Sequence, residues 1–120
     1  MRSGDDVPIV GPLTGVSDAI LAMSRGGLGL VAVVGDAGRV LGIFTDGDLR
    51  RAFEKRIDLQ SARIDSVMHA NPRTIAPDRL AVEAVEMMER YRINALLVAD
   101  ADGRLLGALN MHDLFTARVI

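Results

Sequence analysis

Short apolar runs and helical stripes of apolar residues alternate along this chain, and the whole alternation occurs twice. The two copies, Leu30–Ala52 and Ala95–Ala117, are related by a constant offset of 65 positions, the spacing between Gly38 and Gly103. A unit of about 60 residues buries a small fraction of its surface and is only marginally stable alone. We therefore predict that the two copies fold as one domain around a shared interface, with any functional cleft between them. The residues shared at this offset are Val33, Gly38, Arg39, Leu41, Gly42, Asp48, Leu49 and Ala52, repeated as Val98, Gly103, Arg104, Leu106, Gly107, Asp113, Leu114 and Ala117.

Each copy contains the same order of predicted elements. Apolar residues at helical spacing, such as Val16, Ile20 and Met23, predict a helix before each repeated motif. A short apolar strand follows, and a turn rich in Gly and Asp leads into a second strand, so that each copy contains a hairpin. A second helix then begins at a residue suited to cap it. The predicted strands are 30–34, 39–44, 95–99 and 104–109, the helices after the hairpins are 45–53 and 110–118, and the leading stripe of the second copy is Ala81, Val85 and Met88.

The repeat also divides the chain. We expect an α+β domain with a first repeat at residues 1–57, a polar linker without periodicity at 58–64, and a second repeat at 65–120. The segment that precedes the second copy, Met68–Ile75, has a looser counterpart in Met1–Val10. The first residue is therefore either an ordinary initiator or an internal residue of a longer protein, and the sequence leaves both open.

Composition excludes several classes of protein. Hydrophobic residues make up 49% of the chain and charged residues 25%, which is typical of a globular protein and too apolar for disorder. A net charge of −2 with one Tyr and no Trp supplies neither a basic field nor stacking platforms for nucleic acid. The absence of cysteine excludes disulfides and fits a reducing compartment, so we expect a cytoplasmic protein. Apolar runs such as Leu30–Val34 are far shorter than the roughly 20 residues of a membrane-spanning helix, so we expect a soluble one.

The strongest chemical candidate lies where the second strand of each copy meets its second helix. Thr45 and Asp48 stand there in the first copy, and Asn110 and Asp113 take these positions in the second. A hydroxyl or amide at a helix N-terminus suits phosphate, and a carboxylate one turn later can accept hydrogen bonds from both hydroxyls of a ribose. The same Thr-x-x-Asp spacing is also a capping box that satisfies only the helix backbone. The pattern leaves a nucleotide site and a plain cap both open.

The order of elements and the motif Gly-hydrophobic-hydrophobic-Thr-x-x-Asp-Leu resemble the CBS-domain family, here as Gly42–Leu49 and, in altered form, Gly107–Leu114. The resemblance covers essentially the whole chain, as two CBS repeats that form one Bateman module. It implies two β-α-β-β-α repeats that pack through their sheets as a pseudo-twofold pair. Two symmetry-related clefts result, which often bind adenosyl or other nucleotide ligands and regulate an attached enzyme or transporter. The resemblance places Thr45 and Asp48 in one cleft and their equivalents in the other, with the aspartate contacting ribose.

A closer similarity connects the chain with the C-terminal half of arabinose-5-phosphate isomerases. It rests on Gly42–Arg51, Val67–Ile75, Arg92–Val98 and Leu109–Leu114. Those enzymes interconvert ribulose 5-phosphate and arabinose 5-phosphate in an N-terminal sugar-isomerase domain, and they feed the synthesis of Kdo for lipopolysaccharide or capsule. The similarity implies that this chain is the regulatory part of such an enzyme, attached to an upstream isomerase domain and without a catalytic site of its own. An end product such as CMP-Kdo would suit its clefts, and AMP or ATP stays open as the ligand.

The two copies differ where a ligand is expected. Arg50 and Arg51 follow the capped start of the helix in the first copy, whereas an aromatic and a hydroxyl residue take their places in the second. Together with Lys55 and Arg56 they form either a solvated face that complements the helix dipole or an anion sensor, and Arg50 lies nearest the helix start. We therefore expect the anionic part of a ligand in the cleft of the first copy.

The chain contains two histidines, His69 and His112, which lie in different segments. A metal site needs more donors than these supply, so we predict no metal and no catalytic cofactor. His112 stands beside Asp113, and we expect it to line the second cleft as a donor to a ligand oxygen.

The leading hypothesis is a regulatory module that binds a nucleotide or nucleotide sugar. Because an exposed cleft carboxylate contributes little to stability, we expect Asp48→Ala and Asp113→Ala to weaken binding and leave the fold intact. One alternative is a structural module whose apolar helical stripes hold a homodimer together while its clefts stay empty. Another is an adenine-nucleotide sensor of a different enzyme or transporter. The predicted ligand-binding residues are Thr45, Asp48, Arg50, Asn110, His112 and Asp113.

Overall fold

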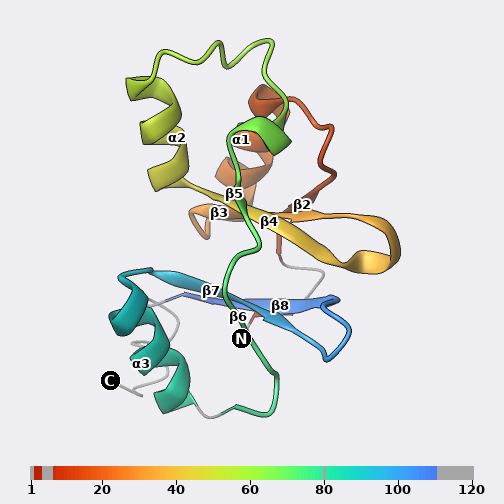
Figure 1. Ribbon diagram of the computed structural model, residues 1–120, viewed down its shortest axis with the longest axis vertical. Coiled ribbons are helices and arrows are strands. Elements are labelled where there is room, and N and C mark those ends of the chain that lie inside the picture. Colours follow the sequence, from red (N-terminus) through yellow and green to blue (C-terminus); the bar gives the residue numbers. More distant parts are fainter. Residues whose placement is uncertain (1, 4–6, 80, 111–120) are drawn as a thin grey trace.

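The computed structural model describes residues 2–3, 7–79 and 81–110. These residues form two small sheets that lie face to face, with the described helices on their outer sides (Figure 1). One sheet has the strand order β2-β3-β4-β5 and carries α1 and α2, and the other has the order β1-β8-β7-β6 and carries α3. The predicted α+β class is confirmed. The strands are β1 Arg2–Ser3, β2 Ile9–Val10, β3 Leu30–Val34, β4 Val40–Thr45, β5 His69–Ala70, β6 Thr74–Ile75, β7 Ala95–Ala99 and β8 Leu105–Asn110, and the helices are α1 Val16–Gly26, α2 Asp46–Glu54 and α3 Ala81–Tyr91.

The two leading helices form because one side of each is apolar. α1 buries Val16, Ala19 and Met23, and α3 buries Ala84 and Met88 at equivalent positions. Both helices span equivalent residues of the two repeats, as the periodicity predicted. The helix predicted at 110–118 lies outside the described residues beyond its first position. Among the helices that the structure describes, none has the length and apolar character needed to cross a membrane.

Each sheet is built around a hairpin of the predicted kind. β3 pairs with β4 and β7 pairs with β8, both antiparallel, and both pairs shift register at equivalent positions. The turns contain Gly38 at φ 77° and Gly103 at φ 82°, a left-handed conformation that a residue without Cβ adopts at no steric cost. β3 and β7 lie between helices and the opposite sheet, which explains their runs of consecutive buried apolar residues.

The two repeats exchange their edge strands. β1, near the N-terminus, pairs with β8 of the second repeat, and β5, which follows the linker, pairs with β4 of the first; both pairings are antiparallel. Ser3 is in register with Gly107 as Ala70 is with Gly42, so the two exchanges are equivalent. Each sheet therefore contains a strand from the other half of the chain.

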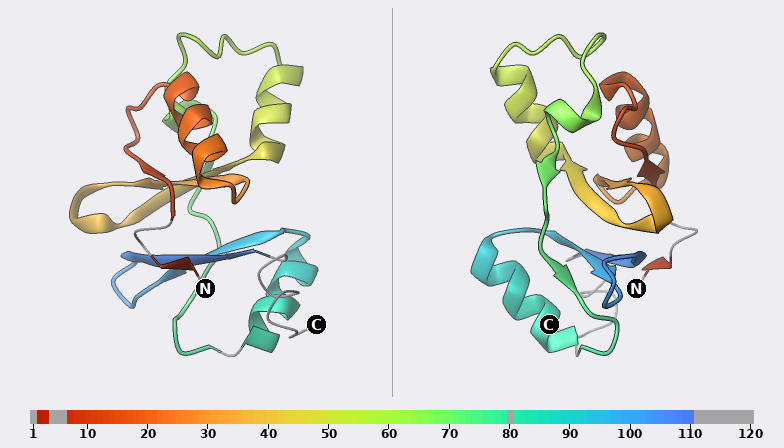
Figure 2. Two further views of the ribbon diagram at one scale, coloured as in Figure 1. Left: turned by 180° about the vertical axis from the view of Figure 1, so that it is seen from behind. Right: turned by 45° about the vertical axis from the view of Figure 1, so that its right-hand side comes forward.

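The two sheets are related by a pseudo-twofold axis (Figure 2). Arg39 and Arg104 are equivalent residues of the two hairpins, and they form an isolated antiparallel bridge with each other. Beside this bridge, the backbone N–H of Val40 donates to the Gly103 carbonyl at 2.9 Å. Two equivalent residues that pair antiparallel with each other lie beside a local twofold axis, so the predicted packing of the repeats through their sheets is confirmed. The core between the sheets consists of Val7, Leu28, Leu30, Ala32, Ile43, Leu97 and Ala108.

The segment predicted as a linker, 58–64, is anchored beside the start of α1. The backbone N–H of Ile64 donates to the Thr14 carbonyl at 2.7 Å, and that of Val16 donates to the Ala62 carbonyl at 2.9 Å. The second bond satisfies one of the amides that a helix start leaves unpaired. Ile64 is fully buried in the core beneath α1, so the connection between the repeats completes the core of the first repeat.

Candidate functional site

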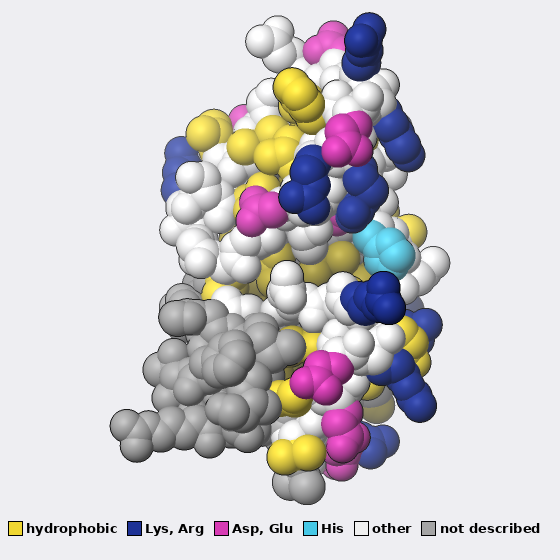
Figure 3. Space-filling model, turned by 90° about the vertical axis from the view of Figure 1, so that its left-hand side faces the viewer, with side chains coloured by type: hydrophobic (Ala, Val, Ile, Leu, Met, Phe, Trp, Pro, Cys, Tyr) yellow, Lys and Arg dark blue, Asp and Glu magenta, His cyan; other side chains and the backbone are white. Residues whose placement is uncertain are grey.

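A cleft of about 960 Å³ opens at the edge of the molecule opposite the hairpin turns. It appears in Figure 3 as a hollow between the two layers. Its lining includes the last residues of β4 and β8 and the residues just before β3 and β7. Both repeats and the segment from β5 to β6 contribute to it. The described residues that line the cleft are Leu28, Gly29, Ile43, Thr45, Asp46, Gly47, Asp48, Arg50, Arg51, His69, Pro72, Arg73, Tyr91, Arg92, Ile93, Asn94, Ala95 and Asn110.

The junction of β4 and α2 holds Thr45 and Asp48 in a capping box. Thr45 Oγ1 accepts a hydrogen bond from the Asp48 backbone N–H at 3.3 Å. Asp48 Oδ2 accepts from the Thr45 backbone N–H at 2.9 Å and from Thr45 Oγ1 at 3.0 Å. These bonds satisfy backbone donors that a helix start leaves unpaired. The capping role that the sequence left open is confirmed for the first repeat.

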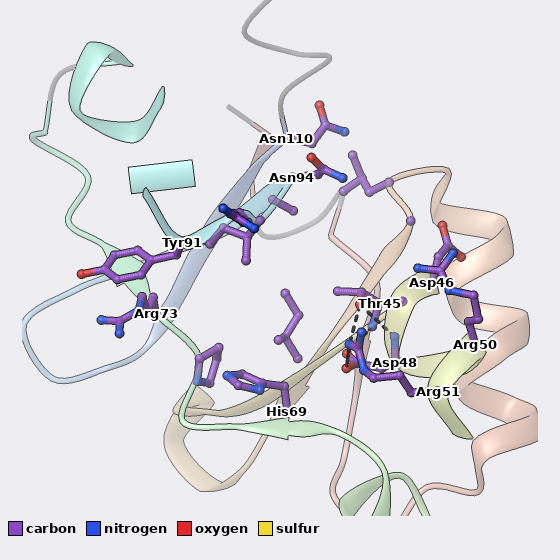
Figure 4. A pocket seen from close by; sticks show the side chains of 18 residues that line it. Thr45, Asp46, Asp48, Arg50, Arg51, His69, Arg73, Tyr91, Asn94 and Asn110 are labelled. Atoms are coloured by element: carbon purple, nitrogen blue, oxygen red, sulfur yellow. Dashed lines mark hydrogen bonds and ion pairs between the residues drawn. The ribbon is translucent and has the colours of Figure 1, made fainter. Parts of the chain in front are cut away.

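Asp48 is 8% exposed and is the one buried charged residue among those described. Arg51 Nη2 donates to its Oδ1 at 2.6 Å (Figure 4). The expectation of an exposed carboxylate that contributes little to stability is wrong, because Asp48 caps the helix and pairs with an arginine while shielded from water. Losing a helix cap alone costs about 1 kcal/mol. Asp48→Ala is therefore expected to destabilise the fold as well as to change the cleft.

Arginine side chains surround the cleft. Arg50 and Arg51 belong to the wall formed by α2, and Arg73 and Arg92 come from the second repeat and its lead-in. None of Arg50, Arg73 and Arg92 forms an ion pair with a described carboxylate. The described lining contains only two acidic residues, although the whole chain has a net charge of −2. Figure 3 shows cationic side chains on both sides of the hollow and a histidine beside it. The cleft thus suits an anionic ligand.

The wall of the second repeat contains a stacked pair that sequence reasoning missed. Arg73 Cζ lies 3.5 Å from the centroid of the Tyr91 ring, a cation–π contact at the rim of the cleft (Figure 4). The equivalent residues of the first repeat are Pro8 and Gly26, and a Cβ on Gly26 would lie 2.5 Å from Pro8 Cγ. The 65-residue offset carried the signal, because an Arg–Tyr pair stands where the twin repeat has a Pro–Gly pair.

Arg92 was also missed, although its backbone sets it apart from the other described non-glycine residues that line the cleft. It follows α3 directly with φ 54°, and the equivalent residue after α1 is Gly27 with φ 68°. This left-handed conformation favours glycine and costs a residue with a Cβ about 1 kcal/mol. A strained residue that lines a cleft is a candidate functional residue. Arg73 and Arg92 line the wall opposite Arg50 and Arg51, so cations from both repeats face the cleft.

The structure places four of the six predicted site residues in this one cleft. The sequence assigned Asn110 to a separate cleft from Thr45, and the structure corrects this. β4 and β8 end at the same edge on either side of the pseudo-twofold axis, so their last residues line one cavity. The four residues are Thr45, Asp48, Arg50 and Asn110, and the other two, His112 and Asp113, lie outside the described residues.

The remaining cations of the basic cluster do not reach the cleft. Lys55 and Arg56, just beyond the last turn of α2, are exposed and absent from its described lining, as expected of a solvated face that complements the helix dipole. His69 lies on β5 and lines the cleft near Pro72. The part of the chain that the structure describes contains no group of three or more His, Asp or Glu residues placed to hold a metal ion.

Comparisons with known proteins identify close relatives. The sequence profile of the CBS domain matches residues 1–55 and 64–120. The arabinose 5-phosphate isomerases KdsD of Pseudomonas aeruginosa and Yersinia pestis are each 46% identical to this chain over 120 residues, and that of Escherichia coli is 41% identical. All of this chain is covered, but it spans only 36–37% of the length of these relatives.

Solved structures share the fold over nearly the whole chain. A CBS domain protein from Pyrobaculum aerophilum complexed with AMP superimposes with a TM-score of 0.86 at 21% identity, covering 100% of this chain and 95% of that one. A putative signal-transduction protein with CBS domains from Burkholderia ambifaria superimposes with a TM-score of 0.84 at 28% identity, covering 94% and 82%. Since the profile matches both repeats and the fold agrees from end to end, the chain belongs to the CBS-domain family, as a tandem pair of CBS domains.

Proposed function

We propose that this chain is the regulatory module of an arabinose-5-phosphate isomerase and that its cleft binds an anionic ribonucleotide, with CMP-Kdo as the first candidate. One observation carries the proposal: the buried carboxylate of Asp48, at the start of α2, lies in a cleft lined by four arginines, three of which form no ion pair with a described carboxylate. The identity with KdsD isomerases supports the parent activity. The AMP complex of a CBS protein with the same fold supports a nucleotide as the class of ligand.

The cleft offers a separate partner for each part of such a ligand. Asp48 is an acceptor for ribose hydroxyls, and the backbone N–H groups at the start of α2, with Arg50, suit a phosphate. Arg73 and Arg92 on the opposite wall suit the carboxylate of a sugar acid. A volume of about 960 Å³ falls within the range of small-molecule sites. Thr45 and Asn110 complete the proposed set in the cleft, and His112 and Asp113 stay proposed from the sequence.

The proposed role in the parent protein is regulation without catalysis in this segment. We infer that two repeats, 1–57 and 65–120, act together as one module attached to a sugar-isomerase domain. The parent would act in the cytoplasm in the supply of Kdo for lipopolysaccharide or capsule. Because the chain spans about a third of the KdsD relatives, ligand binding here would change the activity of a site elsewhere in that protein.

Calorimetric titration of the chain with CMP-Kdo, CMP, AMP and ATP tests this proposal. Asp48→Asn keeps the size of the side chain and loses its charge, so we expect at least about a tenfold loss of affinity. Asp102→Asn is the matched control, because that carboxylate is exposed in the β7–β8 hairpin turn away from the cleft. Binding of none of the four ligands, or equal affinity in Asp48→Asn and the wild type, would contradict the proposal.

A structural dimerisation module is the second candidate, and exposed apolar side chains favour it. Leu13 is 67% exposed, Leu21 on α1 is 53% exposed and Phe53 on α2 is 73% exposed. Residues of this kind gather at interfaces between copies of a protein. Sedimentation at several concentrations separates the candidates. A dimer that forms with concentration and ignores every nucleotide would favour the structural role, whereas heat from AMP or ATP alone would favour an adenine-nucleotide sensor.

A further inference from the structure

We propose that Arg51 is a latch on the nucleotide site, and that it makes the cleft selective for ribonucleotides carrying an anionic group over uncharged nucleosides. The inference rests on the proposed function of the cleft and deepens it by assigning ligand selection to one side chain. Arg51 donates a hydrogen bond to the carboxylate of Asp48, the group that we propose accepts hydrogen bonds from the ribose of a ligand.

The carboxylate of Asp48 is nearly saturated while Arg51 is in place. A carboxylate accepts about four hydrogen bonds, two at each oxygen. Oδ2 already accepts two, from the backbone N–H and the Oγ1 of Thr45. Oδ1 accepts one, from Arg51 Nη2 at 2.6 Å. Because the two hydroxyls of a ribose need two acceptor positions and one is left, the Arg51 guanidinium must leave before the diol binds fully.

The latch is held loosely enough to open. The Arg51 side chain is 59% exposed, although that of Asp48 is only 9% exposed, so water can solvate the guanidinium once it leaves the carboxylate. The guanidinium lies over Gly47, since a Cβ on that glycine would be 3.4 Å from Arg51 Nη1 and 3.5 Å from Nη2. The missing side chain at Gly47 thus lets the guanidinium approach the first turn of α2 closely (Figure 4).

The displaced guanidinium stays beside the place where a phosphate would bind. The start of α2 attracts phosphate, and Arg51 presents paired donors that match phosphate oxygens. A phosphorylated ligand therefore exchanges the Asp48 ion pair for a new one, whereas a nucleoside breaks that pair without a replacement. In the second repeat, His112 and Thr116 stand at the positions of Gly47 and Arg51, so the sequence restricts this latch to the first repeat.

Titration of the wild type and of Arg51→Ala with cytidine, CMP, adenosine and AMP tests the latch. We expect the variant to bind each nucleoside at least as tightly as the wild type does, because its acceptor is free. We expect it to bind CMP or AMP about tenfold more weakly, because the phosphate loses a partner. Lys55→Ala removes a cation just beyond the same helix, outside the described lining of the cleft, and should leave both affinities unchanged.

The outcomes of this titration separate the latch from the proposed function. If Arg51→Ala loses affinity equally for nucleoside and nucleotide, or if the ratio of the two affinities is unchanged, the latch is overturned and the proposed function still stands. No binding of any of these ligands or of CMP-Kdo, by wild type or variant, overturns both. Arg51→Lys keeps the charge but loses the paired donors. Its ratio of nucleotide affinity to nucleoside affinity should therefore lie between those of the wild type and Arg51→Ala. Thermal unfolding of each variant confirms that it is folded.

Discussion

The ends of α1 and α3 have the same backbone conformation but carry different side chains. α1 ends at Gly26 and is followed by Gly27, whereas α3 ends at Tyr91 and is followed by Arg92, with both following residues in the left-handed region. In the first repeat Pro8 packs directly against the glycine, and in the second the equivalent contact is a cation stacked on an aromatic ring. The difference teaches that the cleft owes its asymmetry to a few side chains at equivalent positions and needs no change of fold.

The ends of β4 and β8, which also line the cleft, differ in the side chains that they carry. Thr45 and Asp48 give the first repeat a capped helix with a buried carboxylate, and Arg51 completes that wall. Asn110 stands at the equivalent strand end of the second repeat and lines the same cleft. The first wall thus carries an acceptor for hydroxyl groups beside its arginines, while the second carries arginines and an aromatic ring. A cleft with two unlike walls can orient an unsymmetrical ligand.

The largest expected difference between the repeats lies in their cores. Phe44 is fully buried beneath α1 with Ile64, whereas its equivalent, Leu109, is half-buried against the core of the second repeat. We expect Phe44→Ala to lower the free energy of unfolding by about 3–5 kcal/mol and Leu109→Ala by about 2 kcal/mol. Urea unfolding monitored by circular dichroism measures both values. If Leu109→Ala lowered the free energy of unfolding as much as Phe44→Ala does, the two cores would not differ in the expected way.

An exchange of residues after the leading helices tests the next difference. Arg92→Gly removes a Cβ from the left-handed region, so we expect it to raise the free energy of unfolding by about 1 kcal/mol. The reverse change, Gly27→Arg, should lower it by a similar amount, because no neighbour obstructs a Cβ there and only the backbone is strained. Thermal unfolding measures both changes.

The same exchange tests the role of Arg92 in the cleft. If Arg92 is kept in a strained conformation for its charge, Arg92→Gly should be more stable and bind CMP-Kdo more weakly than the wild type. Calorimetry on the purified variants gives the affinity. Greater stability with unchanged affinity would remove Arg92 from the proposed site and leave only its strain.

The smallest expected effect is the coupling between Arg73 and Tyr91. A double-mutant cycle with Arg73→Ala and Tyr91→Ala should give an interaction free energy of about 0.5–1 kcal/mol, the value for an exposed cation–π pair. The equivalent Pro8 and Gly26 have no such interaction. Additive effects of the two substitutions would show that the stacked arrangement does not persist in solution.

Most of the fold was predictable because its determinants are local in the chain. The buried runs 30–34 and 95–99 are strands, the stripes through Met23 and Met88 are helices, and the turn glycines close hairpins, all as predicted. The exchange of β1 and β5 between the sheets was not predicted. Strands of two residues carry too little periodicity to show which sheet they join.

The candidate site was predictable only in its first wall. Thr45 and Asp48 stand in a recognisable motif, and Arg50 follows them on the same helix. Arg73 and Arg92 lie in segments that match the isomerase pattern, but they were missed as site residues because the two segments meet at one cleft only in the folded protein. The burial of Asp48 and its pairing with Arg51 were missed because they depend on how the guanidinium folds over the helix start.

The sequence by itself determined the repeat, the order of elements, the α+β class and the CBS-domain family. Periodicity, turn residues and a cap act within a few positions, so they can be recognised along the chain. Only the tertiary structure decided that Asn110 shares a cleft with Thr45, that arginines from both repeats meet there, and that Asp48 is buried under Arg51. The first two facts depend on the pseudo-twofold packing of two sheets, which brings together residues far apart in the chain. The third depends on how the Arg51 side chain folds back over the start of α2.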